Sequence, residues 1–336
     1  MRSEDVGALT RRTLLRGAAG GAALIASGAL PAWTRPPRAA TALRRPDSLP
    51  FPHLPAGTPS MAKIEHIVVL MMENHSFDNF LGMVPDQVAG RELVDGLRHV
   101  HGRTRNSNPR PGGGRVIASR AASPCQLHDL PSQSWNATHL SWNGGQMDGF
   151  VKACGPIAMR YWDEHDLPFT YSLVKHFPIG ERYFSSVMAQ TFPNRRFFFA
   201  GTSSGTVDDK TDAIQALPAN GTIFDRLDQH AINWGTYYQS TPSQDILAAA
   251  VKPTWAPRTK KMDQFYIDVA AGRLPAFTFI DPDYGTTSEE NPQDIQVGER
   301  FVASVVNALM KAPSWKSTAL FITWDEHGGY YDHVPP

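Results

Sequence analysis

The 336-residue sequence has no net charge, little cysteine and no long apolar segment. Its 32 basic residues balance 32 acidic residues without a block of like charge, which excludes a nucleic-acid partner. Two cysteines allow at most one disulfide, and Cys125 and Cys154 could pair in an exported protein or stay reduced. The apolar run at residues 17–30 is too short and glycine-rich for a comfortable transmembrane helix. The remaining composition, 41% hydrophobic and 19% charged residues, is typical of a globular protein.

The first 42 residues predict an export signal and no part of the fold. Arg11 and Arg12 precede the apolar run, and this pattern resembles the signal read by the twin-arginine export machinery. An uncleaved membrane anchor is the alternative. Residues 43–62 are rich in proline and polar residues and predict a linker, so residues 63–336 are expected to form one large domain. The expected location is the periplasm, the cell surface or the medium.

Residues 63–82, KIEHIVVLMMENHSFDNFLG, contain the first candidate site. The apolar, β-branched run at 64–72 predicts a strand buried on both faces of a mostly parallel sheet. It ends abruptly in Glu73 and Asn74. Ligands of open α/β sheets bind where the carboxyl ends of the strands meet their loops. The candidate site therefore begins at Glu73.

A second run, residues 318–324, predicts another buried strand and is followed by Asp325 and Glu326. If the two strands are parallel neighbours, these two residues meet Glu73 and Asn74 at one edge of the sheet. Three carboxylates cannot all stay ionised there without a cation. Oxygen donors of this kind favour one hard divalent ion, of a kind that the sequence does not identify. The alternative is that each pair of residues caps a helix or a turn.

Further strands and helices alternate along the chain. Residues 232–238 and 276–280 predict strands, and Thr222 with Asp225 predicts a capping box for a helix that ends near Gln229. Apolar residues at helical spacing between 301 and 310 predict an amphipathic helix. This alternation indicates an α/β fold with a parallel sheet and right-handed crossovers.

Thr191 lies at the expected start of a helix. Pro193 fits the first turn of a helix that continues through 195–200, because its missing N–H costs nothing there. Free N–H groups and the positive end of the helix dipole would favour an anion beside the Thr191 hydroxyl. Local sequence alone favours an N-cap threonine that only satisfies backbone donors.

Residues 98–120 predict a structureless stretch with six arginines. Such a stretch is typical of a solvated surface loop, although arginines close to a phosphate site could attract an anionic headgroup.

Four segments together carry a resemblance to a known family. They follow one another in the family's order: ENHSFDNFLG at 73–82, WNGGQMDGF at 142–150, QTFPNRRFFFAGTSSG at 190–205 and WDEHGGYYDHVPP at 324–336. These segments resemble the bacterial phosphoesterase family that contains phospholipases C and an acid phosphatase branch. The resemblance implies a three-layer α/β/α sandwich with a mostly parallel central sheet, similar to alkaline phosphatases.

The resemblance also implies roles for particular residues. It makes Thr191 the nucleophile, with a phosphothreonine intermediate. It implies one divalent ion held by these residues: Glu73, Asn74, Thr191, Asp325 and Glu326. Asn194 and Arg195 are expected to hold phosphate oxygens, although Arg195 could as easily brace the loop. The proton for the leaving alcohol is expected from one of three histidines, and the sequence does not choose among them: His139, His327 and His333.

The implied function is an exported phospholipase C that cleaves phosphatidylcholine-like lipids to diacylglycerol and a phosphorylated headgroup. Transient contact with a membrane surface follows from that substrate. One alternative is a phosphomonoesterase of the acid phosphatase type, and another is a non-catalytic lipid- or surface-binding protein that keeps the fold. Aromatic residues at the rim would favour the lipid diester, and most of the seven in or near the motifs are expected in the core: Trp135, Trp142, Tyr161, Trp162, Phe192, Tyr330 and Tyr331.

The sequence departs from the family in two places. Asn291, between Glu290 and Pro292, stands where the family usually has a histidine expected to contact the phosphate or the leaving group. The chain also ends at Pro336, whereas relatives continue with a further strand and a histidine-containing segment, so a C-terminal truncation is expected.

Overall fold

The computed structural model describes residues 53, 55, 58, 63–100, 103–125, 130–210 and 215–336. The predicted export signal at 1–42 lies outside the described residues, as does most of the predicted linker at 43–62. In the described part of the chain, no helix has both the length and the apolar character needed to cross a membrane.

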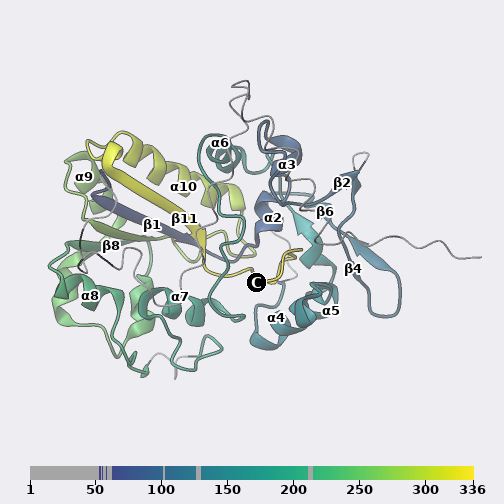
Figure 1. Cartoon of the computed structure of the whole chain (residues 1–336), viewed down its shortest axis with the longest axis horizontal. Coiled ribbons are helices and arrows are strands. Elements are labelled where there is room, and N and C mark those ends of the chain that lie inside the picture. Colours follow the sequence, from purple (N-terminus) through teal and green to yellow (C-terminus); the bar gives the residue numbers. More distant parts are fainter. Residues whose placement is uncertain are drawn as a thin grey trace, which may run out of the picture. The chain divides into compact units, whose positions relative to one another are not determined.

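A five-stranded parallel sheet forms the centre of the fold (Figure 1). Its strands, in spatial order, are β11 (Thr318–Trp324), β1 (His66–Met72), β10 (Phe277–Asp281), β8 (Trp234–Tyr238) and β9 (Thr259–Lys261). β1 and β11 pair in parallel from His66 opposite Thr318 to Met72 opposite Trp324. The predicted α/β class and the predicted pairing of these two strands are therefore confirmed.

Helices cover both faces of this sheet (Figure 1). They are α7 (Thr191–Ala200) and α8 (Ile223–Gln229) on one face, and α9 (Met262–Ala270) and α10 (Ile295–Met310) on the other. Successive side chains of a strand point to opposite faces. Val68 and Leu70 therefore pack in the cluster that contains α9 and α10, whereas Val69 and Met71 pack with α7 and α8.

Two of the helices start where the sequence predicts, and one starts earlier. Thr222 is the N-cap of α8, and its side chain and that of Asp225 form the expected capping box. Thr191 is the first residue of α7, directly after the N-cap Gln190. α10 is longer than its predicted core and begins six residues earlier, because the Asp294 side chain accepts a hydrogen bond from the Gln296 N–H and caps it.

A third hydrophobic cluster, rich in aromatic rings, involves shorter elements. These are α2 (Phe77–Leu81), α3 (Val84–Gln87), α4 (Trp135–Trp142), α5 (Phe150–Cys154), α6 (Pro168–His176) and the 3₁₀ turn η3 (Pro156–Met159). The 3₁₀ turn η2 (Asn143–Gly145) follows α4 and has no buried residue. Three further 3₁₀ turns, η5 (Ser243–Leu247), η6 (Pro253–Arg258) and η7 (Trp315–Ser317), connect the elements of the sheet. The cluster buries four of the seven motif aromatics, Tyr161, Trp162, Tyr330 and Tyr331. The other three are only partly buried.

The prediction that residues 98–120 lack structure is wrong. They form two antiparallel ribbons, β2 (His99–Val100) with β3 (Arg103–Thr104) and β4 (Ser107–Pro109) with β5 (Arg115–Ile117). β6 (Ser119–Arg120) then pairs in parallel with β7 (Arg160–Tyr161). Gly112, Gly113 and Gly114 all have positive φ, so the glycines that suggested an open loop instead make the tight turn of the second ribbon.

Two further predictions need comment. β11 was expected to be buried, but it lies at one end of the five-strand order and its side chains are partly exposed, Phe321 by 57%. An end strand has a neighbour on one side only, so a nearly continuous apolar run does not by itself show burial. Cys125 and Cys154 are not bonded to each other, which agrees with the reduced alternative.

Candidate active site

The ends of three adjacent strands bring acidic side chains together. Glu73 follows β1, Asp325 follows β11, and Asp281 is the last residue of β10. All three are at most 4% exposed. The Asn74 N–H donates a hydrogen bond of 3.3 Å to Asp325 Oδ1, so the two strand ends are in direct contact. This edge is the one at which the sequence predicted a site.

Arg195 on α7 lies among the three carboxylates and is 1% exposed. Its Nε donates to Asp325 Oδ2 at 2.8 Å, its Nη1 lies 3.1 Å from Asp281 Oδ1, and its Nη2 lies 3.5 Å from Glu73 Oε1. One guanidinium therefore faces three buried carboxylates. Charge-assisted hydrogen bonds of this kind are strong, and removal of the cation would leave the acids unpaired.

Two hydroxyl groups complete the contacts of this guanidinium. Arg195 Nη1 donates to Ser243 Oγ at 2.6 Å and to the Tyr284 hydroxyl at 3.0 Å, and both hydroxyls also contact Asp281. The side chain is fully engaged by the protein. These contacts favour the bracing role that the sequence left open for Arg195 over the binding of phosphate oxygens.

Thr191 and Asn74 face each other at the start of α7. Thr191 Oγ1 lies 3.5 Å from Asn74 Oδ1, at the limit of a hydrogen bond, and Thr191 is 9% exposed. The residue occupies the first turn of the helix, where backbone N–H groups are not used by the helix itself. The predicted nucleophile and one predicted metal ligand are thus brought together.

Two carboxylate oxygens at this edge are buried and have no hydrogen-bond partner among the described residues, Glu73 Oε2 and Glu326 Oε1. Glu326 uses its other oxygen to accept the Gly328 N–H at 2.8 Å. Burial and the nearby Asp325 charge raise the pKa of Glu73 and of Glu326 well above the ordinary value of a glutamate. Buried carboxylate oxygens without donors match the oxygen ligands of a hard cation. The donor set therefore fits the divalent ion that the family resemblance implies.

The predicted ligands are less tightly gathered than a closed metal site requires. Within the described part of the chain, the carboxylates of Glu73, Asp325 and Glu326 do not come within 4.8 Å of one another as a group. Two of these carboxylates, Glu73 and Asp325, are paired with the Arg195 guanidinium.

Sequence reasoning missed two acids beside this edge. Asp209 Oδ1 accepts the N–H of Phe192, the residue after Thr191, at 2.7 Å. Burial raises the pKa of Asp209 to about 6, with further contributions from Asp325 and Glu290. The Glu290 side chain hydrogen-bonds with Gln133, and burial raises its pKa as well. No spacing marks Asp209, whereas Glu290 was visible beside the atypical Asn291 and could have been proposed.

The three predicted histidines lie at different places. The His327 Nδ1 accepts the Gly329 N–H, so its Nε2 carries the proton and donates to Thr138 Oγ1 at 3.1 Å. Burial lowers the pKa of His327 to about 4, which keeps the ring neutral. His139 follows Thr138 on α4, and its Nδ1 donates to the Trp135 carbonyl at 2.8 Å. Both rings are therefore associated with α4.

The third histidine, His333, belongs to a separate cluster. It donates from Nδ1 to Asp78 Oδ2 at 2.8 Å and from Nε2 to Asp95 Oδ1 at 3.0 Å, and the hydrogen bond with Asp78 raises its pKa to about 9. One ligand atom from each of Asp78, Asp332 and His333 lies within 4.8 Å of the others, so this cluster could hold a metal ion. Such an ion would have to compete with the His333 proton.

The first and last motifs pack directly on each other. The Ser76 hydroxyl donates to the Tyr331 carbonyl at 2.6 Å, and Gly328 has φ +66° with its Cα against the Asn74 carbonyl, where a Cβ has no room. His75 stacks on Phe80 with ring centroids 3.8 Å apart.

Asn194 accepts the Val187 N–H and donates to the Ala189 and Gln190 carbonyls, so its amide holds the loop that precedes Thr191.

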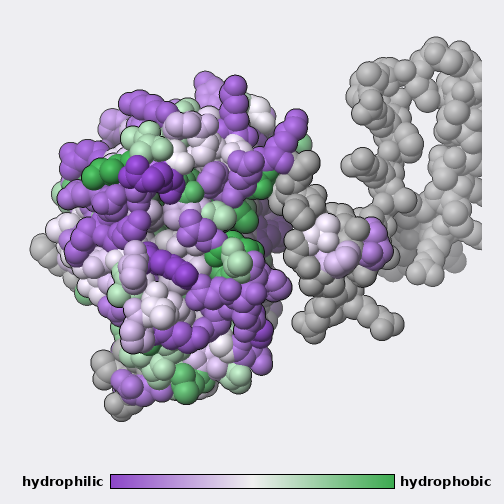
Figure 2. Space-filling model, turned by 90° about the vertical axis from the view of Figure 1, so that its left-hand side faces the viewer, coloured by the Kyte–Doolittle hydropathy of each residue, from purple (hydrophilic) through white to green (hydrophobic). Residues whose placement is uncertain are grey.

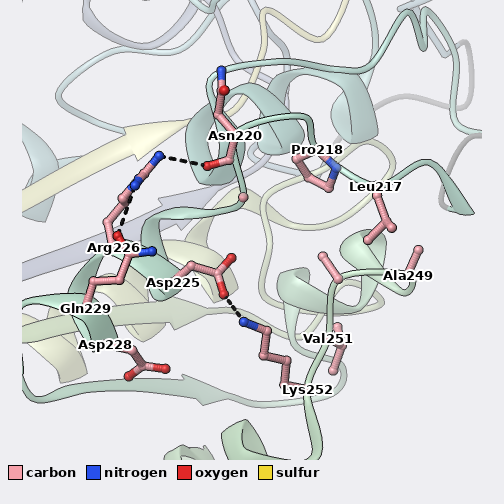
Figure 3. A pocket seen from close by; sticks show the side chains of 12 residues that line it. Leu217, Pro218, Asn220, Asp225, Arg226, Asp228, Gln229, Ala249, Val251 and Lys252 are labelled. Atoms are coloured by element: carbon pink, nitrogen blue, oxygen red, sulfur yellow. Dashed lines mark hydrogen bonds and ion pairs between the residues drawn. The ribbon is translucent and has the colours of Figure 1, made fainter.

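A cavity of about 530 Å³ lies elsewhere, between α8 and residues 249–252 (Figure 3). Charged side chains that line it already have partners. Lys252 forms an ion pair with Asp225, and Arg226 donates a hydrogen bond to Gln229. It contains none of the predicted site residues.

The sequence is similar to proteins of a known family. The model of the Phosphoesterase family matches residues 64–336. The chain is 32% identical to non-specific phospholipase C6 of Arabidopsis thaliana over 292 residues, which cover 81% of this chain and 54% of the relative. It is 27% identical to phospholipase C A of Mycobacterium tuberculosis, with coverages of 82% and 60%, and 26% identical to the non-hemolytic phospholipase C of Pseudomonas aeruginosa, with coverages of 97% and 49%. The chain spans about half the length of the curated relatives it matches.

Proposed function

The chain belongs to the Phosphoesterase family, and we propose that it is an exported phospholipase C that hydrolyses phosphatidylcholine-like lipids. The observation that carries this proposal is the position of the Thr191 hydroxyl, in the first turn of α7 and 3.5 Å from Asn74 Oδ1. The names of the relatives in plants and bacteria support the same class of substrate.

In this proposal the Thr191 oxygen attacks phosphorus. A bond forms between Oγ1 and phosphorus as Oγ1 loses its proton, and the bond from phosphorus to the diacylglycerol oxygen breaks. The leaving alcohol takes up a proton, so the net step moves one proton from the Thr191 hydroxyl to the alcohol. Water then releases the phosphorylated headgroup from the phosphothreonine and restores the Thr191 hydroxyl. The positive end of the α7 dipole favours the negative charge of the phosphoryl group, while the Phe192 N–H itself is held by Asp209.

Glu73, Asn74, Asp325 and Glu326 would hold the divalent ion beside Thr191. When bound, such an ion lowers the pKa of a hydroxyl and neutralises charge on phosphoryl oxygens. The protein residues position Thr191, because Asn74 is fixed through its N–H to Asp325, and Asp325 is fixed by Arg195. The proton donor remains one of the three predicted histidines: His139, His327 and His333.

The charge of the site favours a diester over a monoester. A phosphomonoesterase needs cationic donors for a phosphate dianion. Here Arg195 is occupied by three carboxylates, and Asp209 already accepts the Phe192 N–H. Phe192, Trp135 and Trp142 are partly exposed and could line an apolar approach for acyl chains or receive a choline cation.

We infer the finer architecture and the location on the same basis. The parallel sheet with helices on both faces supports the three-layer α/β/α sandwich of the alkaline phosphatase type. Export by the twin-arginine route, to the periplasm, cell surface or medium, rests on Arg11 and Arg12, which lie outside the described residues.

The test is the substrate preference of the full chain at one pH with one divalent metal. We expect p-nitrophenyl phosphocholine to be cleaved faster than p-nitrophenyl phosphate. The reverse preference would assign the protein to the acid phosphatase branch. Hydrolysis of neither substrate, with any of several divalent ions, would support the non-catalytic lipid- or surface-binding alternative that Asn291 suggests.

A further inference from the structure

Two loops expose several large apolar side chains. The first is residues 91–95, which follow α3, and the second is residues 177–184, which follow α6; together we call them the aromatic loops. Leu93 is 98% exposed and Tyr183 is 68% exposed, and Phe177 and Phe184 are exposed by 41% and 39%. Single exposed apolar residues are ordinary, but four on two adjoining loops indicate an interaction surface.

Hydrogen bonds join the two loops into one surface. Arg91 Nη2 donates to the Phe177 carbonyl at 2.7 Å, and the Asp95 N–H donates to Glu181 Oε2 at 2.8 Å. Arg182 Nη2 lies 2.6 Å from Asp95 Oδ2. Leu93 lies between two of these attachment points along the chain, so it is held beside the second loop.

The aromatic loops are attached to the candidate site at two points. Residues 177–190 connect α6 directly to Thr191. Asp95 also accepts a hydrogen bond from His333, which in turn bonds Asp78 in the first motif. A surface bound by these loops would therefore be linked to the first motif and to the segment that leads into Thr191.

The aromatic loops carry no excess of positive charge. Arg91 and Arg182 stand against three acids, Glu92, Asp95 and Glu181, and both arginines take part in the contacts that join the loops, as do Asp95 and Glu181. No positive charge is left over to select a strongly anionic partner. Leucine, phenylalanine and tyrosine instead suit the boundary between headgroups and acyl chains, where a ring or an aliphatic side chain enters and a hydroxyl stays wet.

Other exposed surface of the domain looks different. On the face seen from the left of Figure 1, hydrophobic residues gather only in small groups among hydrophilic ones (Figure 2). Ile267 on α9, a helix on that side of Figure 1, is 55% exposed and lies outside the aromatic loops. It provides a matched control for the loss of one exposed apolar side chain.

We propose that the aromatic loops form a docking surface for a zwitterionic phospholipid bilayer and hold the protein on the membrane while Thr191 reacts. The proposal rests on the proposed function, because an enzyme that attacks phosphatidylcholine meets its substrate in an aggregate. It assigns the recognition to apolar insertion and not to charge.

The test compares a triple variant, Leu93→Ser with Phe177→Ser and Tyr183→Ser, with the Ile267→Ser control. Binding is measured by sedimentation with phosphatidylcholine vesicles, with Thr191→Ala added to every protein so that the vesicles are not consumed. We expect the triple variant to lose at least about tenfold in vesicle partition, and the control to change by less than about twofold. Binding of the unsubstituted loops should change little between low and high salt, because the loops have no excess positive charge and the bilayer is zwitterionic.

Activity then separates this proposal from the proposed function. With Thr191 intact, the triple variant should lose activity on phosphatidylcholine vesicles and keep its rate on p-nitrophenyl phosphocholine within about twofold. Vesicle binding that survives the triple substitution, or that requires anionic lipid and disappears in salt, would overturn the docking proposal. So would a wild-type chain that forms dimers through the loops and binds no vesicles. If p-nitrophenyl phosphocholine is not cleaved by the wild type, the proposed function fails, whatever the vesicles show.

Discussion

Two charge clusters connect the first motif to the last, and they differ in the cation that balances them. In the Arg195 cluster, a guanidinium that is 1% exposed faces Glu73, Asp281 and Asp325. In the His333 cluster, an imidazole contacts Asp78 and Asp95. Arginine stays charged at all accessible pH values, whereas histidine does not.

The cation of the Arg195 cluster is therefore permanent, whereas the cation of the His333 cluster is lost when the histidine loses its proton. The Arg195 cluster lies beneath Thr191 and keeps its cation under any condition in which the protein is folded. The His333 cluster depends on a proton that Asp78 and Asp95 hold in place. Substitutions should therefore affect the first cluster at every pH, and the second only over a limited pH range.

The largest effect is expected from substitution of Thr191, which tests the proposed nucleophile and leaves the Arg195 cluster unchanged. Thr191→Ala removes the proposed attacking oxygen but little buried volume, so kcat should fall at least about a thousandfold while the melting temperature and metal content stay nearly unchanged. Thr191→Ser should keep part of the activity. Wild-type turnover by Thr191→Ala would mean that the nucleophile lies elsewhere.

The next effect breaks the Arg195 cluster itself. Arg195→Met leaves three buried carboxylates without their cation, and we expect a loss of about 3–5 kcal/mol in the free energy of unfolding, with loss of activity. Arg226→Met is the control, because Arg226 is exposed and should cost less than about 0.5 kcal/mol. Denaturant unfolding at pH 7 measures both. Equal stability of the two variants would show that the guanidinium does not balance the acids.

The sequence predicted the framework of this site well, for a local reason. Apolar runs that end in polar residues marked β1 and β11, and both strand ends meet as expected. Pro193 correctly placed the start of α7, because proline restricts the backbone whatever surrounds it. Features of this kind are encoded within a few residues.

The rest could not be predicted because it depends on contacts between distant segments. The contact of Arg195 with Asp281, 86 positions away, has no signal in either neighbourhood. The Phe192 N–H that holds Asp209 is 17 positions away from it. The ribbons at 98–120 were missed because polar hairpins bury too little to leave a periodic pattern.

A smaller effect tests the backbone contact between the two motifs. Gly328 and Gly144 have the same φ of +66°, but a Cβ at Gly328 would collide with the Asn74 carbonyl, while nothing lies within 4 Å at Gly144. We expect Gly144→Ala to cost about 1 kcal/mol from backbone strain, and Gly328→Ala about 2–3 kcal/mol because Asn74 must also move. Activity should fall only for Gly328→Ala. Equal losses of stability and activity in both variants would mean that the close approach is not important.

The smallest effect is confined to the His333 cluster and depends on pH. Hydrogen bonding to Asp78 raises the pKa of His333 to about 9, from about 6.5 in the unfolded chain. The folded state then binds more protons between these values. This contribution to stability is complete below about pH 6.5 and is lost as the pH rises through 9. Burial also raises the pKa of Asp332 to about 7, so its contribution is lost as the pH rises from about 4 to 7.

The two contributions can be separated because their pH ranges differ. His333→Asn should flatten the fall in melting temperature between pH 7 and 9, and Asp332→Asn should flatten it between pH 5 and 7. Each change should be about 1 kcal/mol or less, since Asp95 is 41% exposed and its interaction is screened. The charged groups that face His333 are Asp78, Asp95 and Asp332, with Arg182 next to Asp95. Arg195 does not titrate between pH 7 and 9. If the melting temperature of His333→Asn falls over this range as steeply as that of the wild type, the pH dependence there lies outside both clusters.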